Sequence, residues 1–188
     1  LHNRILVENQ RLIDANARLR KQTTIDPLTG YGNRQYALKR LDDALRQSRQ
    51  RGGAACLLMI RIDHYADLEQ RHGKALTQQL VLAFSRRLRQ LVRPMDVLAR
   101  ISPDHFCLIT HQADSANATP GSFRRLYDGL NHRAYKTAGG FFQLSVSVSL
   151  MKSADKDEID GELLLTRSLR GLDASHDGKR IVEQALSG

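Results

Sequence analysis

The sequence contains few cysteines and few aromatic residues. Its 188 residues include only two cysteines, Cys56 and Cys107, and aromatic residues make up 5% of the chain. Both cysteines lie in apolar, strand-like runs, which favours buried free thiols in a reducing compartment over a disulfide or a metal pair. With so few aromatic side chains, we do not expect a platform that stacks nucleic-acid bases.

Long apolar runs are absent as well. No stretch of the sequence has the length that a membrane-spanning helix needs, and the N-terminus lacks the pattern of a signal peptide. We therefore expect this region to be cytoplasmic and to make no membrane contact of its own. Hydrophobic residues make up 41% of the chain, which is enough to bury one substantial core beside a short extension.

The net charge of +9 is spread over several expected helices. Its densest points are residues 86–89 and the pair at 124–125. A solvated basic surface explains this distribution best, and a site for a small phosphate-bearing ligand is the second interpretation. No nucleic-acid-binding motif accompanies the basic residues, so we expect no nucleic-acid partner.

Residues 1–22 have the pattern of one long helix. Apolar residues recur at alternating spacings of four and three, as in a coiled-coil seam, and Glu8 interrupts one seam position. The seam residues are Leu1, Ile5, Leu12, Ala15 and Leu19. Fewer than four heptads are visible, so an isolated coiled coil would be marginal. We expect a helix that forms homodimers or transmits a signal from an upstream domain; a single helix packed on the following domain is the alternative.

The rest of the chain alternates between helical and strand-like patterns. Helices are expected at 34–49, 65–72, 75–92, 122–132 and 158–175. Strands are expected at 54–62, 96–101, 105–111, 143–150 and 178–182. The second and third of these strands form a hairpin across Ser, Pro and Asp, which are all turn-forming residues. This order predicts an α/β fold in which helices flank a mixed central sheet of about five strands.

A compact turn joins the first helix to the rest. Residues 26–34 read Asp-Pro-Leu-Thr-Gly-Tyr-Gly-Asn-Arg, in which Pro27 and the glycines end a helix and Asn33 can cap the next one. This run resembles the Asp-Pro-Leu-Thr-Gly-Leu-x-Asn-Arg motif that opens GGDEF domains, the diguanylate cyclase domains that join two GTP molecules into cyclic di-GMP. It departs from that motif only at Tyr31.

The hairpin extends the resemblance. The family has Arg-x-x-Asp followed by Arg-x-Gly-Gly-Asp/Glu-Glu-Phe, and this chain has Arg93-x-x-Asp96 followed by Arg-Ile-Ser-Pro-Asp-His-Phe at 100–106. The resemblance covers about residues 23–185. It implies a nucleotidyl-cyclase-like GGDEF fold at 23–188, preceded by a signalling or dimerisation helix of the coiled-coil type at 1–22.

The resemblance also identifies changed catalytic positions. Joining two GTP molecules needs metal ions held by carboxylates. Arg61 stands where the first metal-binding Asp is expected, and a guanidinium cannot ligate Mg²⁺. Asp63 survives, but it lies about one strand repeat further along and cannot simply take over. Asp104 keeps the second carboxylate position, with His105 where the family has Glu.

Further positions have changed in the turn, in the guanine site and in the phosphate site. Ser102 and Pro103 replace the two glycines, and Pro103 lacks a backbone N–H. Glu69 and Gln78 replace the usual guanine-reading Asn and Asp, and Ser175 replaces the phosphate-binding Lys. We therefore expect no cyclase activity, no catalytic residues and no productive Mg²⁺ binding. A weakly active diguanylate cyclase is the alternative.

Arg93 and Asp96 match the family's inhibitory site, which holds the product dinucleotide. Arg can pair with phosphate or bond a guanine edge, and a carboxylate accepts from guanine N–H groups. Another Arg from the next helix often contributes, and Arg124 or Arg125 is the candidate, with Arg124 preferred. The sequence thus predicts a cyclic di-GMP site at Arg93, Asp96 and Arg124, while an ordinary ion pair is the alternative.

A retained fold without the catalytic residues favours a non-catalytic signalling module. We expect it to dimerise through the N-terminal helix and to regulate a partner protein or an attached domain, with cyclic di-GMP as a candidate input. A GTP-sensing pseudo-enzyme is disfavoured because the guanine and phosphate contacts have changed. The histidines lack a metal-ligand spacing, which leaves a metal at His105 and Asp104 as a minor alternative.

Overall fold

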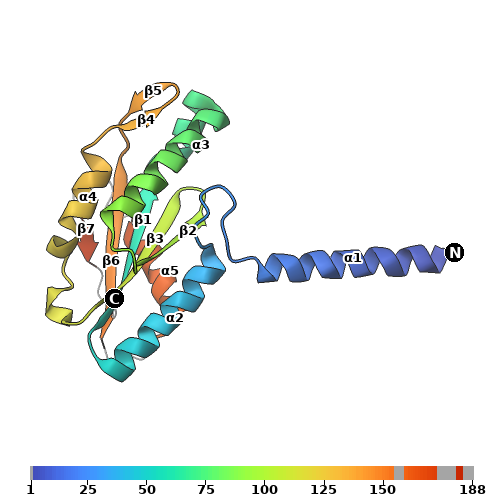
Figure 1. The fold of residues 1–188 in the computed structure, drawn as a ribbon, viewed down its shortest axis with the longest axis horizontal. Helices are drawn as coiled ribbons and strands as arrows, with labels where there is room; N and C mark the ends of the chain where they lie inside the picture. The colour runs from blue at the N-terminus through green and yellow to red at the C-terminus, as the bar shows by residue number, and fades with distance from the viewer. Residues whose placement is uncertain (1, 155–158, 173–180, 184–188) are drawn as a thin grey trace.

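A five-stranded sheet forms the centre of the protein. The computed structural model describes residues 2–154, 159–172 and 181–183, and the strand order is β2-β3-β1-β6-β7 (Figure 1). The strands are β1 (Ala54–Ile62), β2 (Val97–Ser102), β3 (His105–Gln112), β6 (Val146–Ala154) and β7 (Ile181–Glu183). Only the β6–β7 pair is parallel among these neighbours, so the predicted mixed sheet is confirmed.

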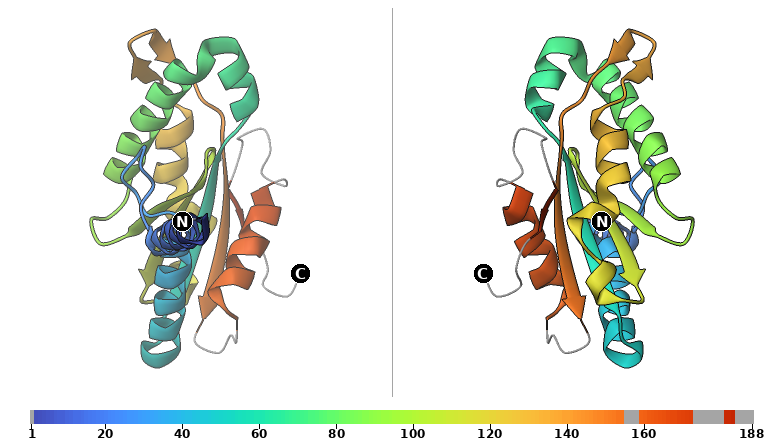
Figure 2. Two further views of the ribbon diagram at one scale, coloured as in Figure 1. Left: turned by 90° about the vertical axis from the view of Figure 1, so that its right-hand side faces the viewer. Right: turned by 90° about the vertical axis from the view of Figure 1, so that its left-hand side faces the viewer.

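Helices cover both faces of this sheet, as the edge-on views of Figure 2 show. One face packs against α2 (Arg34–Arg51) and α5 (Gly161–Gly171), and the other against α3 (Tyr65–Leu91) and α4 (Arg124–Asn131). The predicted α/β class with flanking helices is therefore confirmed. The remaining elements are the short hairpin β4 (Tyr135–Thr137) and β5 (Gly140–Phe142), and the 3₁₀ turns η1 (Ser115–Asn117) and η2 (Pro120–Phe123).

The central strand β1 is buried on both sides because its side chains alternate between two cores. Leu58 and Ile60 point toward α3 and α4, whereas Leu57 and Met59 point toward α2 and α5. A nearly continuous apolar run is what such a strand needs, and Arg61 is the one residue of β1 that is not fully buried.

The two helices predicted at 65–72 and 75–92 are confirmed as the two segments of α3, which are separated by a left-handed backbone at Gly73, with a φ of 81°. The β4–β5 hairpin was not predicted, because its strands are only three residues long and too short for a clear alternating pattern. Strand β6 consequently begins at Val146 rather than 143.

The ends of two other predictions lie outside the described residues. The helix predicted at 158–175 is described as α5 from Gly161 to Gly171, and positions 158 and 173–175 are not described. The strand predicted at 178–182 is described as β7, and positions 178–180 are not described.

Helix α1 (His2–Gln22) extends away from the domain (Figure 1), so it does not pack on it. Its described side chains are exposed, including the seam residues Ile5 at 58% and Leu12 at 63%. The apolar seam is thus open to a partner. No helix in the described ranges is long and apolar enough to cross a membrane.

The turn after α1 is held by side chains of the opening motif. Asp26 accepts from the Thr29 backbone N–H at 3.0 Å and from the Thr29 hydroxyl at 2.6 Å. Asn33 caps α2 by accepting from the Tyr36 N–H at 3.2 Å. Arg100 in β2 pairs with Asp26 at 3.4 Å and ties this turn to the hairpin.

Both cysteines are buried and free, as predicted. Burial raises the pKa of Cys56 to about 11 and that of Cys107 to about 12. Both groups therefore remain thiols near neutral pH and act as small apolar side chains.

Candidate functional site

The hairpin turn and the end of β1 lie side by side. Arg61 is the Cα partner of His105, and the Ile62 N–H donates to the Asp104 carbonyl oxygen at 2.9 Å. The structure thus brings Arg61, Asp63, Asp104 and His105 to one end of the sheet.

Arg61 and Asp63 form an ion pair at this end. The Arg61 Nε lies 3.0 Å from the Asp63 carboxylate, and the side chains are 22% and 6% exposed. The Ser145 and Ser147 hydroxyls each donate to the same carboxylate at 2.8 Å. Asp63 is therefore surrounded by donors from its own chain, and its oxygens do not point to an open ligand site.

The turn itself contains a second small network. The Ser102 hydroxyl lies 2.7 Å from the His105 Nδ1, which lies 2.9 Å from the Asp104 carboxylate. This arrangement is satisfied when Nδ1 carries a proton and donates to Asp104. The hydrogen bond with His105 lowers the pKa of Asp104, although partial burial opposes the shift. The Arg100 guanidinium donates to the Pro103 carbonyl oxygen at 2.8 Å and closes the turn.

These residues do not fit a magnesium centre. Mg²⁺ prefers oxygen ligands in octahedral geometry, and carboxylates usually supply the protein's share. Here a guanidinium occupies the end of β1 and is paired with Asp63, while Asp104 is bonded within the turn. Among the described residues, no group of three or more His, Cys, Asp or Glu side chains could hold a metal ion.

A different arrangement lies at the far end of the hairpin, where Arg93 and Asp96 precede β2. The Asp96 carboxylate accepts from the Arg93 backbone N–H at 2.9 Å and from Arg93 Nε at 3.2 Å. The Thr110 hydroxyl of β3 donates to Asp96 at 2.8 Å and accepts from the Arg93 guanidinium. The Asp96 side chain is 7% exposed, whereas that of Arg93 is 49% exposed.

Two hollows flank this pair. One measures about 450 Å³ and lies against α2, where Arg40 and Met95 join its wall. The other measures about 250 Å³ and includes Arg125 of α4. Arg93 and Asp96 line both, so the half-exposed guanidinium is accessible from either side.

Comparison with known proteins places the chain in a family. The family model described as diguanylate cyclase, GGDEF domain, matches residues 23–168. This chain belongs to the GGDEF family. Diguanylate cyclase DgcS of Shewanella oneidensis is 26% identical over 143 residues, which cover 76% of this chain and 46% of DgcS. The chain spans less than half the length of the curated relatives that it matches.

Solved structures confirm the GGDEF fold. The GGDEF domain of FimX from Pseudomonas aeruginosa has a TM-score of 0.76 at 20% identity, over 86% of this chain and 99% of that one. The coiled coil and GGDEF domain of DgcB from Caulobacter crescentus, in complex with cyclic di-GMP, has a TM-score of 0.72 at 22% identity, over 95% of each chain. The chain thus has the fold of a GGDEF domain.

The remaining predicted positions of the GGDEF active site are spread out. Glu69 and Gln78 are exposed on α3, on either side of the break at Gly73. Ser175 lies outside the described residues. The structure therefore brings together the changed metal-site and turn positions, and it leaves the two guanine-site positions on separate helical segments.

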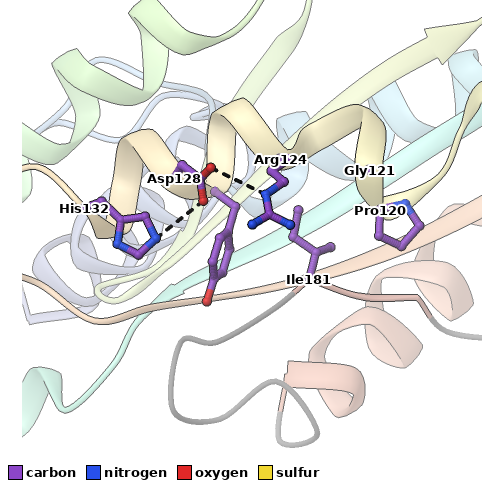
Figure 3. A pocket seen from close by; sticks show the side chains of 7 residues that line it. Pro120, Gly121, Arg124, Asp128, His132 and Ile181 are labelled. Carbon is purple, nitrogen blue, oxygen red and sulfur yellow. Dashed lines mark ion pairs between the residues drawn. The ribbon is translucent and has the colours of Figure 1, made fainter.

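The structure places the two candidate arginines of α4 in different surroundings. Arg124 pairs with Asp128 at 3.6 Å in a separate cavity (Figure 3), whereas Arg125 lines the hollow beside Arg93. Arg124 and Arg125 are adjacent on a helix and point about 100° apart, so sequence spacing alone could not choose between them.

Two further residues of this region were missed. Thr110 bridges Arg93 and Asp96, and Arg89 donates to the Asp96 carbonyl oxygen at 3.2 Å. A buried threonine in the apolar run of β3 was the available signal for Thr110. Arg89 belongs to a basic stretch of α3, and nothing distinguished it from its neighbours.

Proposed function

We propose that this GGDEF domain makes no cyclic di-GMP and works as a regulatory module. The observation that carries the proposal is the Arg61–Asp63 ion pair at the end of β1. It puts a positive charge where the family's metal-binding carboxylate is expected and engages the surviving aspartate. A cation near this point repels Mg²⁺, and the GTP condensation has no other described cluster of metal ligands to use.

Turnover with purified protein tests this proposal. We expect no cyclic di-GMP above a blank when the chain is incubated with GTP and Mg²⁺ or Mn²⁺ and the product is measured by chromatography. An active GGDEF enzyme in the same assay is the positive control. Product formed above the blank by this protein would favour the alternative, a weak cyclase.

We further propose that cyclic di-GMP binds beside Arg93 and Asp96, with Arg125 as the third contact. The half-exposed Arg93 guanidinium can meet a phosphate or a guanine edge, and it borders both the hollow of about 450 Å³ and the hollow of about 250 Å³ that Arg125 lines. Asp96 is nearly buried and already accepts from Arg93 and Thr110, so its part in binding is to orient the guanidinium. The DgcB structure supports this ligand by family likeness.

Calorimetric titration of cyclic di-GMP tests the site. We expect micromolar binding by the wild type and at least a tenfold loss in Arg93→Ala, since a charged hydrogen-bonding contact is worth about 1.5–3 kcal/mol. Arg71→Ala is the matched control, because Arg71 is also paired with an aspartate close in sequence but lies on α3 and lines neither hollow. Equal binding by Arg93→Ala, or no heat with the wild type, would leave the pair as structural.

We also propose that α1 joins two copies of the chain. Its seam is exposed, and an isolated helix of this length is marginal without a partner. Leu12→Asp places a charge in the seam and is expected to yield monomers in sedimentation experiments. Val7→Asp makes the same change at an exposed apolar position off the seam and should leave dimers intact. Monomers in the wild type at high micromolar concentration would contradict the proposal.

A further inference from the structure

The sulfur-bearing side chains of the protein differ widely in exposure. The chain has two cysteines and three methionines, and all five lie in the described part of the structure. Four of them are 0% exposed, namely Cys56, Met59, Cys107 and Met151, whereas Met95 is 78% exposed. Burial also raises the pKa values of both cysteines, and a protonated thiol is a poor nucleophile. A water-soluble oxidant therefore meets the sulfur of Met95 first.

Met95 projects from a turn whose backbone is held in place. The Asp96 N–H donates to the Arg93 carbonyl oxygen at 3.0 Å, which makes Pro94 and Met95 the two central residues of the turn. Pro94 has a fixed φ, and the Asp96 carboxylate accepts from the Arg93 N–H at 2.9 Å. The turn thus presents the Met95 thioether at the surface, between the two residues of the proposed ligand site.

The Met95 side chain borders two hollows. It lines the hollow of about 450 Å³ beside Arg93, together with Arg40. It also lines a neighbouring hollow of about 470 Å³ that includes Tyr36 and Arg89. A flexible, polarisable thioether suits the face or edge of an aromatic base, and the guanidinium groups around it suit acceptor oxygens. A chemical change at this sulfur therefore alters the wall of the ligand site.

We propose that Met95 is an oxidation site through which peroxides weaken ligand binding at Arg93. The thioether sulfur attacks one oxygen of hydrogen peroxide and becomes a sulfoxide. The O–O bond breaks, and the other oxygen leaves with both protons as water, so the sulfur loses the two electrons that the peroxide gains. The effect on the ligand rests on the cyclic di-GMP site proposed above, whereas the selective oxidation of Met95 does not.

Two physical effects of the sulfoxide act in the same direction. The sulfoxide replaces an apolar contact surface by a polar group that water solvates well, so a contact with a base becomes less favourable. Its oxygen is also a hydrogen-bond acceptor, and Arg40 and Arg93 line the same hollow. A guanidinium that donates to the sulfoxide has fewer donors left for the ligand. Oxidation therefore lowers the affinity for the ligand while the charges of the site stay the same.

Peptide mass spectrometry after peroxide treatment of the folded protein tests the selectivity. We expect Met95 to be oxidised at least about tenfold faster than Met59 and Met151, and all three to react at similar rates in urea. The melting temperature should not change, since the sulfoxide forms at the surface and not in the core. Comparable rates for the three methionines in the folded protein would overturn the proposal.

Calorimetric titration of cyclic di-GMP tests the consequence. Oxidation of the wild type should weaken binding about fivefold, the size of effect expected for a lost contact between a thioether and an aromatic ring. Methionine sulfoxide reductases with dithiothreitol should restore the affinity. Met95→Gln should bind weakly without any peroxide, because its amide supplies a polar acceptor at the same place. Met95→Leu is the matched control, and peroxide should leave its affinity unchanged.

The possible results separate this proposal from the cyclic di-GMP site. Equal affinity of the oxidised and the reduced wild type would overturn the oxidation proposal and leave the site in place. A loss of affinity that persists in Met95→Leu would also overturn it, since another residue would then be responsible. No binding by the reduced wild type would instead refute the site at Arg93, and with it the effect proposed for Met95.

Discussion

The two arginine–aspartate pairs of this GGDEF domain have the same chemistry and different surroundings. Arg61 lies near the end of β1 and Asp63 directly follows the strand, and two serine hydroxyls complete the shell of the carboxylate. Arg93 and Asp96 lie before β2, and their guanidinium borders two hollows. The arginine is 22% exposed in the first pair and 49% exposed in the second.

The difference in exposure distinguishes a structural ion pair from a candidate ligand site. A charge that is already paired and desolvated gains little from an external partner, because the existing bonds must break first. A half-exposed guanidinium held by a buried carboxylate keeps free donor capacity in a fixed orientation. We therefore propose structural stabilisation as the role of the first pair and ligand recognition as the role of the second. Two experiments test this contrast, and a third tests the neighbouring hairpin turn.

The largest effect is expected from Asp63→Ala. The change removes the acceptor of Arg61 Nε and of two serine hydroxyls, of which that of Ser147 is buried, and breaking a buried pair costs about 3–5 kcal/mol. Urea unfolding measures the loss. Asp67→Ala, which removes an exposed partner of Arg71, is the control and should cost less than about 1 kcal/mol. A similar loss of unfolding free energy in both variants would mean that the Arg61–Asp63 pair does not stabilise the fold.

A smaller effect is expected from Thr110→Val. The substitution keeps the shape of the side chain and removes the hydroxyl that links Asp96 to Arg93, at a cost of about 1–2 kcal/mol in unfolding free energy. Cyclic di-GMP binding should weaken as well, because the guanidinium loses its support. Thr110→Ser keeps the hydroxyl and should retain binding. Wild-type affinity in the valine variant would show that Arg93 needs no such positioning.

The smallest effect concerns the pH dependence of Asp104. Its pKa lies below the ordinary value of 3.8 because of the hydrogen bond with His105. A carboxyl group whose pKa is lowered by folding stabilises the native state above pH 3.8, and this contribution disappears as the pH falls through the lower, native value. The stability difference between the wild type and Asp104→Asn should therefore shrink below pH 3.8. A difference that stays constant down to pH 2.5 would contradict the assignment.

The fold could largely be predicted from sequence because its signals are strong and local. The apolar run of β1 and the motif from Asp26 to Arg34 each determine a local structure with little help from the rest of the chain. The β4–β5 hairpin could not be predicted, since Tyr135 is buried by contacts with distant α3 and its strands are too short to show a period.

The sequence allowed us to predict which residues belong to the site, but not which residues they contact. The family resemblance located Arg61, Asp63 and Asp104, but the serines that complete the shell of Asp63 lie more than 80 residues away in sequence. The choice between Arg124 and Arg125 likewise depends on which side of α4 faces the hollow. Such contacts depend on the register of the strands and the rotation of the helices, which cannot be predicted from residue types alone.

The bonds at the base of α1 determine its rotational phase relative to the domain. Asn33, which caps α2, donates from its side chain to the Thr23 carbonyl oxygen and from its backbone to the Thr24 carbonyl oxygen, both at 2.9 Å. The helix is therefore fastened one residue after it ends. Each residue inserted into α1 would turn everything upstream by about 100° relative to the sheet, and seven inserted residues would nearly restore the angle. The length of this helix, counted in heptads, therefore sets the angle between the sheet and any segment that precedes α1.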